Sequence, residues 1–186
     1  WAAIGLLVVA TPVAIGASRP KPAAIVAVPR TPDGRLVIRE FVDLECPFCR
    51  ATHVALKLAL ERRATPVVIE RRHVPLGQHE HALPAAVAAC CAGEQGAEDR
   101  FVDLLFAMDE PPSEATCRRV AMDLRLDLSK YDECRSSDRP RQRIASDSAL
   151  ADRTNVAGLP TIDVEGERHV GLLDGARAEA LLARHP

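Results

Sequence analysis

Residues 41–50 read FVDLECPFCR and carry two cysteines, Cys46 and Cys49, at the spacing Cys-x-x-Cys. Structural zinc sites and redox-active cysteine pairs share this spacing, so the flanking sequence has to separate them. Residues 36–44 are rich in β-branched and apolar side chains, which is typical of a strand buried on both faces. Residues 50–63 then place apolar side chains at helical spacing. The cysteine pair is therefore predicted to lie where a strand meets a helix.

This junction has the surroundings that a redox pair needs. Pro47 suits the first turn of a helix, where the N–H that it lacks would be unpaired in any case. Free N–H groups and the positive end of the helix dipole are expected to stabilise a thiolate at Cys46. We expect Cys46 to be exposed, with Cys49 one turn further in. Glu45 has the opposite effect on the thiolate, because a neighbouring carboxylate disfavours it.

A zinc site would require further ligands, usually a second pair at similar spacing. The remaining cysteines form no second Cys-x-x-Cys, although other side chains could supply ligands in principle. These are Cys90, Cys91, His79 and His81. We interpret the histidines as turn and cap residues, and we expect neither a metal nor an organic cofactor. A non-catalytic module that binds zinc or a peptide is the alternative from a different class of protein.

The rest of the chain predicts a single α/β domain over residues 33–186, which is a usual length for one hydrophobic core. After the first helix we expect a strand over 66–71, helices over 85–91, 100–108, 113–124 and 138–153, strands over 161–164 and 168–170, and a helix over 176–183. Asp174 is the predicted N-cap of the last helix. The order is strand–helix–strand, a helical insertion at about 82–155, then strand–strand–helix.

Composition and charge narrow the possible functions. Hydrophobic residues make up 47% and charged residues 27% of the 186 residues, as in an ordinary globular protein. The net charge of -2 gives no electrostatic reason to expect nucleic acid as a partner. Six cysteines are many for a cytosolic protein of this size and common in an exported one. The cysteine content therefore favours an oxidising compartment.

The N-terminal residues 1–17 form an apolar run without a charge, slightly shorter than a membrane-spanning helix. The run can be the end of a transmembrane helix, a single anchor or the apolar region of a secretion signal. A buried soluble helix is disfavoured by Pro12. Residues 18–32 predict an extended, proline-rich linker. Arg19 and Lys21 favour a cytoplasmic domain, but the cysteine content outweighs two charges, so we expect a membrane-anchored domain on the periplasmic side of a bacterial cell envelope.

Two segments resemble the DsbA-like proteins of the thioredoxin superfamily. Residues 41–50 look like the active-site segment of that family, and residues 158–161, Gly-Leu-Pro-Thr, look like its cis-proline loop. The likeness covers roughly residues 22–184. It implies a thioredoxin fold with a helical domain inserted after the second strand, and a cis peptide bond before Pro160. Leu159 departs from the Thr or Val that often precedes this proline.

The resemblance also implies roles for individual residues. Cys46 would be the nucleophile and Cys49 the resolving thiol. Other residues would support the site or contact a substrate: Glu45, Pro47, Phe48, Leu159, Pro160 and Thr161. Some relatives carry an additional structural disulfide where this chain has Cys91 and Cys134. Cys90 and Cys117 could then form another bond, or they could be two buried thiols.

The resulting expectation is a thiol–disulfide oxidoreductase that exchanges its Cys46–Cys49 disulfide with thiols of partner proteins, most simply as an oxidant. A disulfide reductase or isomerase is the alternative within the same class. A membrane redox partner is expected, and a quinone-linked reoxidase resembling vitamin K epoxide reductases, fused to this domain, is one form that it could take.

Overall fold

The computed structural model describes residues 27–186, so the apolar run 1–17 and most of the linker 18–32 lie outside the described residues. The predicted strand–helix–strand unit is present as β1 (Leu36–Val42), α1 (Pro47–Glu61) and β2 (Val67–His73). β1 is buried along its whole length and runs parallel to β2. Within the described part of the chain, none of the helices is both long and apolar enough to traverse a bilayer.

Two further strands complete the sheet. β3 (Thr161–Val164) pairs antiparallel with β1, and β4 (Glu167–Val170) pairs antiparallel with β3, which gives the order β2-β1-β3-β4. The turn between β3 and β4 has positive φ at Glu165 and Gly166, where glycine is favoured. A parallel βαβ unit joined to an antiparallel hairpin in this order is the thioredoxin fold that the sequence predicts.

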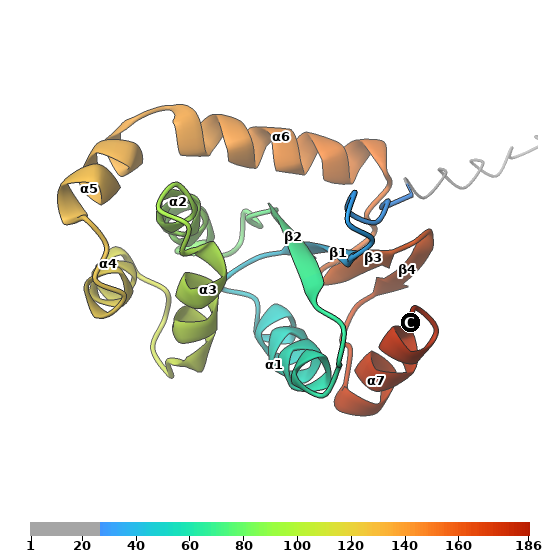
Figure 1. Ribbon diagram of the computed structural model, residues 1–186. Helices are drawn as coiled ribbons and strands as arrows, with labels where there is room; N and C mark the ends of the chain where they lie inside the picture. Colours follow the sequence, from blue (N-terminus) through green and yellow to red (C-terminus); the bar gives the residue numbers. More distant parts are fainter. Residues whose placement is uncertain (1–26) are drawn as a thin grey trace, which may run out of the picture.

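One face of the sheet is covered by α1 and by α7 (Gly175–Ala183), while α6 (Arg139–Arg153) lies on the opposite side (Figure 1). The α7 N-cap is Asp174, as predicted, and its carboxylate accepts a hydrogen bond from the Arg177 N–H at 2.9 Å. The core between the sheet and these two helices is aliphatic. Its buried residues are Leu36, Ile38, Leu56, Ala59, Ile162, Val164, Leu173, Ala178, Leu181 and Leu182.

The helical insertion lies between β2 and β3 and has five helices. They are α2 (Ala82–Gly93), α3 (Glu98–Ala107), α4 (Glu114–Asp123), α5 (Leu128–Ser136) and α6. All residues of α2 from Ala85 to Ala92 are buried, because their small side chains allow the other helices to pack closely around it. The sequence did not predict α5. It buries only Tyr131 and Cys134, which is too few apolar positions to make a helical pattern.

Side chains of α6 satisfy the outer edge of β2. The buried Asp147 accepts hydrogen bonds from the His73 backbone N–H at 3.1 Å and from the Arg72 guanidinium at 3.0 Å. The guanidinium of Arg143 donates to the backbone carbonyl of Arg71 at 3.4 Å. Side chains of α6 therefore occupy backbone groups at the outer edge of β2.

Glu98, at the start of α3, makes the fold sensitive to acid. Its carboxylate accepts hydrogen bonds from His73 at 2.9 Å and from Arg143 at 2.8 Å. Burial alone would raise the pKa of Glu98, but these two partners outweigh burial and lower its pKa to about 2. Because this carboxylate titrates at a higher pH when the chain is unfolded, its stabilisation is complete above about pH 4.5 and is lost as pH falls towards 2.

We expect the free energy of unfolding, measured by urea titration between pH 6 and pH 2, to fall by up to about 3 kcal/mol on account of Glu98. The Glu98→Gln variant should lose this part of the pH dependence while it is already less stable at pH 6. If the free energy of unfolding of Glu98→Gln fell with pH as steeply as that of the wild type, the contacts of Glu98 with His73 and Arg143 would not account for the acid sensitivity.

Candidate active site

The cysteine pair lies at the start of α1, where β1 has just ended. Cys46 is the N-cap residue with extended backbone angles (φ -73°, ψ 122°), and Pro47 follows in the first turn. The Cys46 carbonyl accepts the first helical hydrogen bond, from the Arg50 N–H at 3.1 Å. The first turn contains no acidic residue. The Cys46 sulfur is thus attached at the positive end of the helix, as the sequence predicted.

The prediction that Cys46 is exposed was wrong. Only 5% of Cys46 is accessible and Cys49 is fully buried, whereas the neighbouring Phe48 is 57% exposed. Both cysteines belong to the apolar cluster of the helical insertion, which includes the buried alanines of α2, and Leu159 packs against this cluster. The insertion and the proline loop therefore cover sulfurs that the helix start alone would leave open.

Cys49 has an environment that favours its protonated form. Burial is the main cause that raises the pKa of Cys49 far above its usual range, and the nearby Cys46 sulfur and the Glu40 charge act in the same direction. A weak hydrogen bond from the Asp43 N–H to the Cys49 sulfur, at 3.5 Å, acts against them. The two sulfurs are therefore unequal, with the inner one held as a thiol at neutral pH.

Glu40 is a residue near the site that sequence reasoning missed. It lies in β1, is 1% exposed, and one carboxylate oxygen accepts a hydrogen bond from Arg71 at 3.1 Å. The other oxygen, Oε1, is buried without a hydrogen-bond partner. Two adjacent charged residues, Arg39 and Glu40, within the otherwise apolar LVIREFV strand were the available signal, because charged side chains are rarely buried without a partner. Glu40 is therefore a buried carboxylate whose negative charge contributes to the raised pKa of Cys49.

The loop that precedes β3 brings Pro160 to the same end of the sheet. The Leu159–Pro160 peptide bond is cis, the geometry that the family resemblance implies. Thr161 is paired with Phe41 near the end of β1, so the proline lies beside the strand end from which the cysteine turn emerges. The buried Thr161 hydroxyl donates to the Gly158 carbonyl at 2.6 Å, and the Pro160 carbonyl accepts from the Gly171 N–H at 2.8 Å.

The Glu45 carboxylate is bound by a hydrogen-bond donor from another part of the chain, although Glu45 is adjacent to Cys46 in the sequence. It accepts a hydrogen bond from the His81 backbone N–H at 2.6 Å, immediately before α2. The negative charge next to Cys46 is therefore bound to the start of another helix.

Several histidines contact carboxylates. His53 is buried, and its ring contacts Asp103 of α3 at 2.8 Å. His79 contacts Asp43 at 2.9 Å, and His81 occupies the N-cap position of α2. Over residues 27–186, no three or more His, Cys, Asp or Glu side chains are grouped so that they could hold a metal ion.

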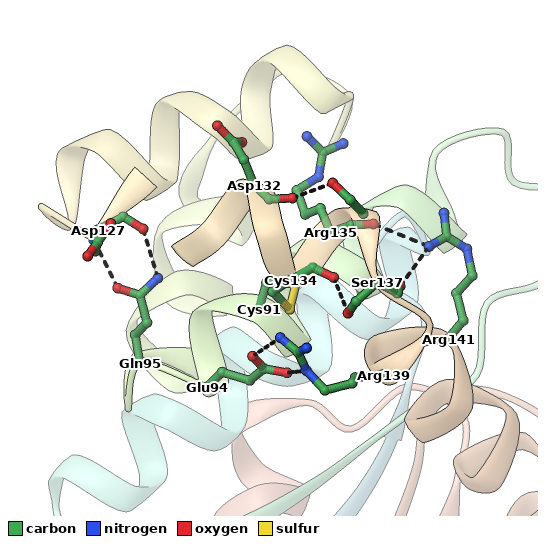
Figure 2. Close-up of a disulfide and its surroundings, with 11 residues drawn as sticks. Cys91, Glu94, Gln95, Asp127, Asp132, Cys134, Arg135, Ser137, Arg139 and Arg141 are labelled. Atoms are coloured by element: carbon green, nitrogen blue, oxygen red, sulfur yellow. Dashed lines mark hydrogen bonds and ion pairs between the residues drawn. A yellow bond between two sulfur atoms is a disulfide. The ribbon is translucent and has the colours of Figure 1, made fainter. Parts of the chain in front are cut away.

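A disulfide joins Cys91 of α2 to Cys134 of α5, with their Cα atoms 5.6 Å apart (Figure 2). This is the pairing that the family resemblance implies. Ion pairs and hydrogen bonds surround it, including Arg139 on Glu94 at 3.1 Å. Cys90 and Cys117 are free, buried thiols, so the second bond that the sequence left open between them is not formed. Burial raises the pKa of each to about 12, which keeps both protonated.

A sheet of this topology, with a Cys-x-x-Cys pair at the start of its first helix and a cis-proline at the same end, defines a redox domain of the thioredoxin class. The family model described as thioredoxin matches residues 31–183. The chain belongs to the thioredoxin family, and its fold is that of a thiol–disulfide oxidoreductase.

Similar solved structures come from thiol–disulfide proteins. The chain resembles a thioredoxin-like oxidoreductase from Silicibacter pomeroyi with a TM-score of 0.72 and 25% identity, over 82% of this chain and 87% of that one. It has the same fold as the thiol-disulfide exchange protein alpha-DsbA2 from Wolbachia pipientis, with a TM-score of 0.70, 16% identity, and coverage of 83% and 82%. The catalytic domain of Proteus mirabilis ScsC also has this fold, with a TM-score of 0.69 and 16% identity, over 83% of this chain and 85% of that one.

Curated relatives are much longer proteins. The chain is 39% identical to the Na(+)/H(+) antiporter NhaA 3 of Salinispora tropica over 137 residues, which is 73% of this chain and 21% of the antiporter. It is 29% identical to the Na(+)/H(+) antiporter NhaA 1 of Mycolicibacterium gilvum, over 78% of this chain and 24% of that protein. The chain thus spans about a fifth to a quarter of the length of these relatives.

Proposed function

We propose that the protein oxidises thiols of partner proteins through its Cys46–Cys49 pair. The observation that carries the proposal is the asymmetry of the two sulfurs at one helix start. Cys46 is the N-cap residue and retains some accessibility, whereas Cys49 is fully buried and is held as a thiol. An incoming sulfur can therefore reach only the outer member of the pair.

The transfer has two steps. A substrate thiolate attacks the Cys46 sulfur of the disulfide, the Cys46–Cys49 bond breaks, and the Cys49 sulfur leaves and takes up a proton. A second substrate thiolate attacks the substrate sulfur of this mixed disulfide, and Cys46 leaves as a thiolate. Two electrons pass from the substrate, which becomes a disulfide, to the protein, which becomes a dithiol. The reverse sequence would make the protein a reductase.

Particular residues serve these steps. Cys46 is the N-cap residue of α1, so its sulfur leaves at the positive end of the helix dipole, where negative charge is favoured. We infer that Glu40 exchanges the proton of Cys49, because Glu40 Oε1 is buried without a hydrogen-bond partner and the Glu40 charge acts on that sulfur. The exposed Phe48, with Val170 and Leu172, offers an apolar surface at this end of the molecule for a substrate chain.

An oxidising compartment outside the cytoplasm suits this assignment. A second, structural disulfide is common in exported proteins and rare in cytosolic ones. One similar structure, with a TM-score of 0.68, is described as a periplasmic thioredoxin-like protein from Salmonella enterica. The antiporter relatives favour a position at a membrane, because the matched domain accounts for only part of those proteins. Because the antiporter relatives favour a position at a membrane, we also propose that the redox partner is a membrane protein.

Isomerase or reductase activity is the second candidate, and one similar structure is described as a putative protein disulfide isomerase from Nitrosomonas europaea. The reduction potential separates the candidates. We expect a value nearer to about -120 mV, typical of an oxidant, than to about -270 mV, typical of a reductant. The fraction of oxidised Cys46–Cys49 should be measured in glutathione buffers by alkylation and mass spectrometry, together with the oxidation of a reduced, unfolded model protein. A strongly reducing potential without substrate oxidation would overturn the oxidant assignment.

A further inference from the structure

Asp43 is linked to both cysteines through its backbone. Its carbonyl accepts a hydrogen bond from the Cys46 N–H at 3.2 Å, and its N–H donates to the Cys49 sulfur at 3.5 Å. The residue follows directly after β1 and is fully shielded from solvent, with an exposure of 1%. Any displacement of Asp43 would therefore shift both sulfur positions at once.

The Asp43 carboxylate holds this turn together. Oδ1 accepts the Glu45 N–H at 2.7 Å, which adds a side-chain bond to the backbone bond that closes the turn at Cys46. Aspartate is favoured at this first position of a turn because its short side chain reaches the backbone two residues on. The conformation that carries the cysteine pair out of the strand is thus fixed by a side chain as well as by the backbone.

The second carboxylate oxygen ties the turn to the loop before α2. Oδ2 accepts the Leu76 backbone N–H at 2.8 Å and contacts the His79 ring nitrogen Nδ1 at 2.9 Å. The Glu45 carboxylate adds a parallel tie to the His81 N–H at 2.6 Å. This loop leads into α2, whose buried residues share one apolar cluster with Cys46 and Cys49. The active-site turn is therefore fastened to the helical insertion at two points.

We propose that Asp43 is the positioning residue of the cysteine pair, with His79 as the side chain that contacts its carboxylate. Asp43 keeps the turn in the conformation that positions the two cysteines at the start of α1. The equilibrium constant for an intramolecular disulfide depends on how well its thiols are positioned. Loss of the Asp43 carboxylate should therefore weaken the Cys46–Cys49 disulfide relative to glutathione, beyond any general loss of stability. The proposal rests on the proposed redox function.

The test measures the equilibrium with glutathione, in which one oxidised glutathione converts the Cys46–Cys49 dithiol to the disulfide and becomes two reduced glutathiones. In Asp43→Ala we expect the equilibrium constant to fall about tenfold, which makes the potential about 30 mV more oxidising. Asp43→Asn keeps an oxygen for the Glu45 N–H but not the charge towards His79, so a fall of about threefold is expected.

Asp147→Ala is the matched control. Asp147 is equally buried and also binds a backbone N–H and a cationic partner, but it lies at the β2 edge. It should lower the denaturation midpoint and leave the glutathione equilibrium unchanged. A wild-type constant in Asp43→Ala, or an equal shift in Asp147→Ala, overturns the proposal. If Asp43→Ala does not fold, a wild-type constant in Asp43→Asn overturns it. Failure of the proposed function would look different, because the wild-type pair itself would then have a strongly reducing potential and would not oxidise substrate thiols, whatever the Asp43 variants do.

Discussion

Replacing Cys46 with serine is expected to reduce the rate of disulfide transfer to a reduced protein substrate by at least about a thousandfold, to the background level. The hydroxyl of serine cannot form a disulfide, and the remaining sulfur cannot take over the first step because Cys49 is fully buried. Its raised pKa also keeps Cys49 protonated and unreactive at neutral pH. The measurement is the loss of free thiols from a reduced, unfolded protein, followed by alkylation and mass spectrometry.

Two variants serve as controls for this result. Cys49→Ser retains the Cys46 thiol, so it should attack a single-cysteine peptide supplied as its mixed disulfide with glutathione, displace reduced glutathione, and then release the peptide slowly, since no resolving thiol is present. Cys90→Ser changes a free, buried thiol outside the turn and should transfer disulfides at the wild-type rate. Activity above a tenth of wild type in Cys46→Ser would show that another cysteine exchanges disulfides with the substrate.

Of the variants described, the one that removes the Cys91–Cys134 disulfide should show the largest fall in the free energy of unfolding. The two cysteines are 43 residues apart, and on the loop-entropy model a crosslink over such a loop contributes about 4 kcal/mol. The double variant Cys91→Ala, Cys134→Ala avoids new free thiols. We expect its free energy of unfolding, from urea titration without reductant, to fall by about this amount.

Cys90→Ala is the comparison for the disulfide variant, because Cys90 is adjacent to Cys91, is buried in the same helix and forms no bond. It removes one buried sulfur and should cost about 1 kcal/mol. If the double variant cost no more than twice this, the crosslink would have no stabilising effect of its own and the packing of α2 would account for the whole loss.

The strands and most helices could be predicted from the sequence because their apolar residues recur at strand or helix spacing, as in β1 and α1. The disulfide and the cis bond at Pro160 followed from the resemblance and could not have been derived from spacing. The accessibility of Cys46 was predicted wrongly because it depends on which distant segments pack over the helix start, here the insertion and Leu159. The positions of Glu40 and Asp43 were missed for the same reason, since their partners lie in β2 and in the loop after it.

The way in which α6 completes the edge of β2 has a consequence for how the protein meets unfolded chains. An open sheet edge can recruit an extended peptide from another molecule and start aggregation. At β2 the outward Arg71 carbonyl and His73 N–H are already occupied by Arg143 and Asp147. The opposite edge, β4, is short and carries the charged Glu167 and Arg168. With both edges protected in this way, an extended peptide that approaches the molecule is hindered from adding to the sheet.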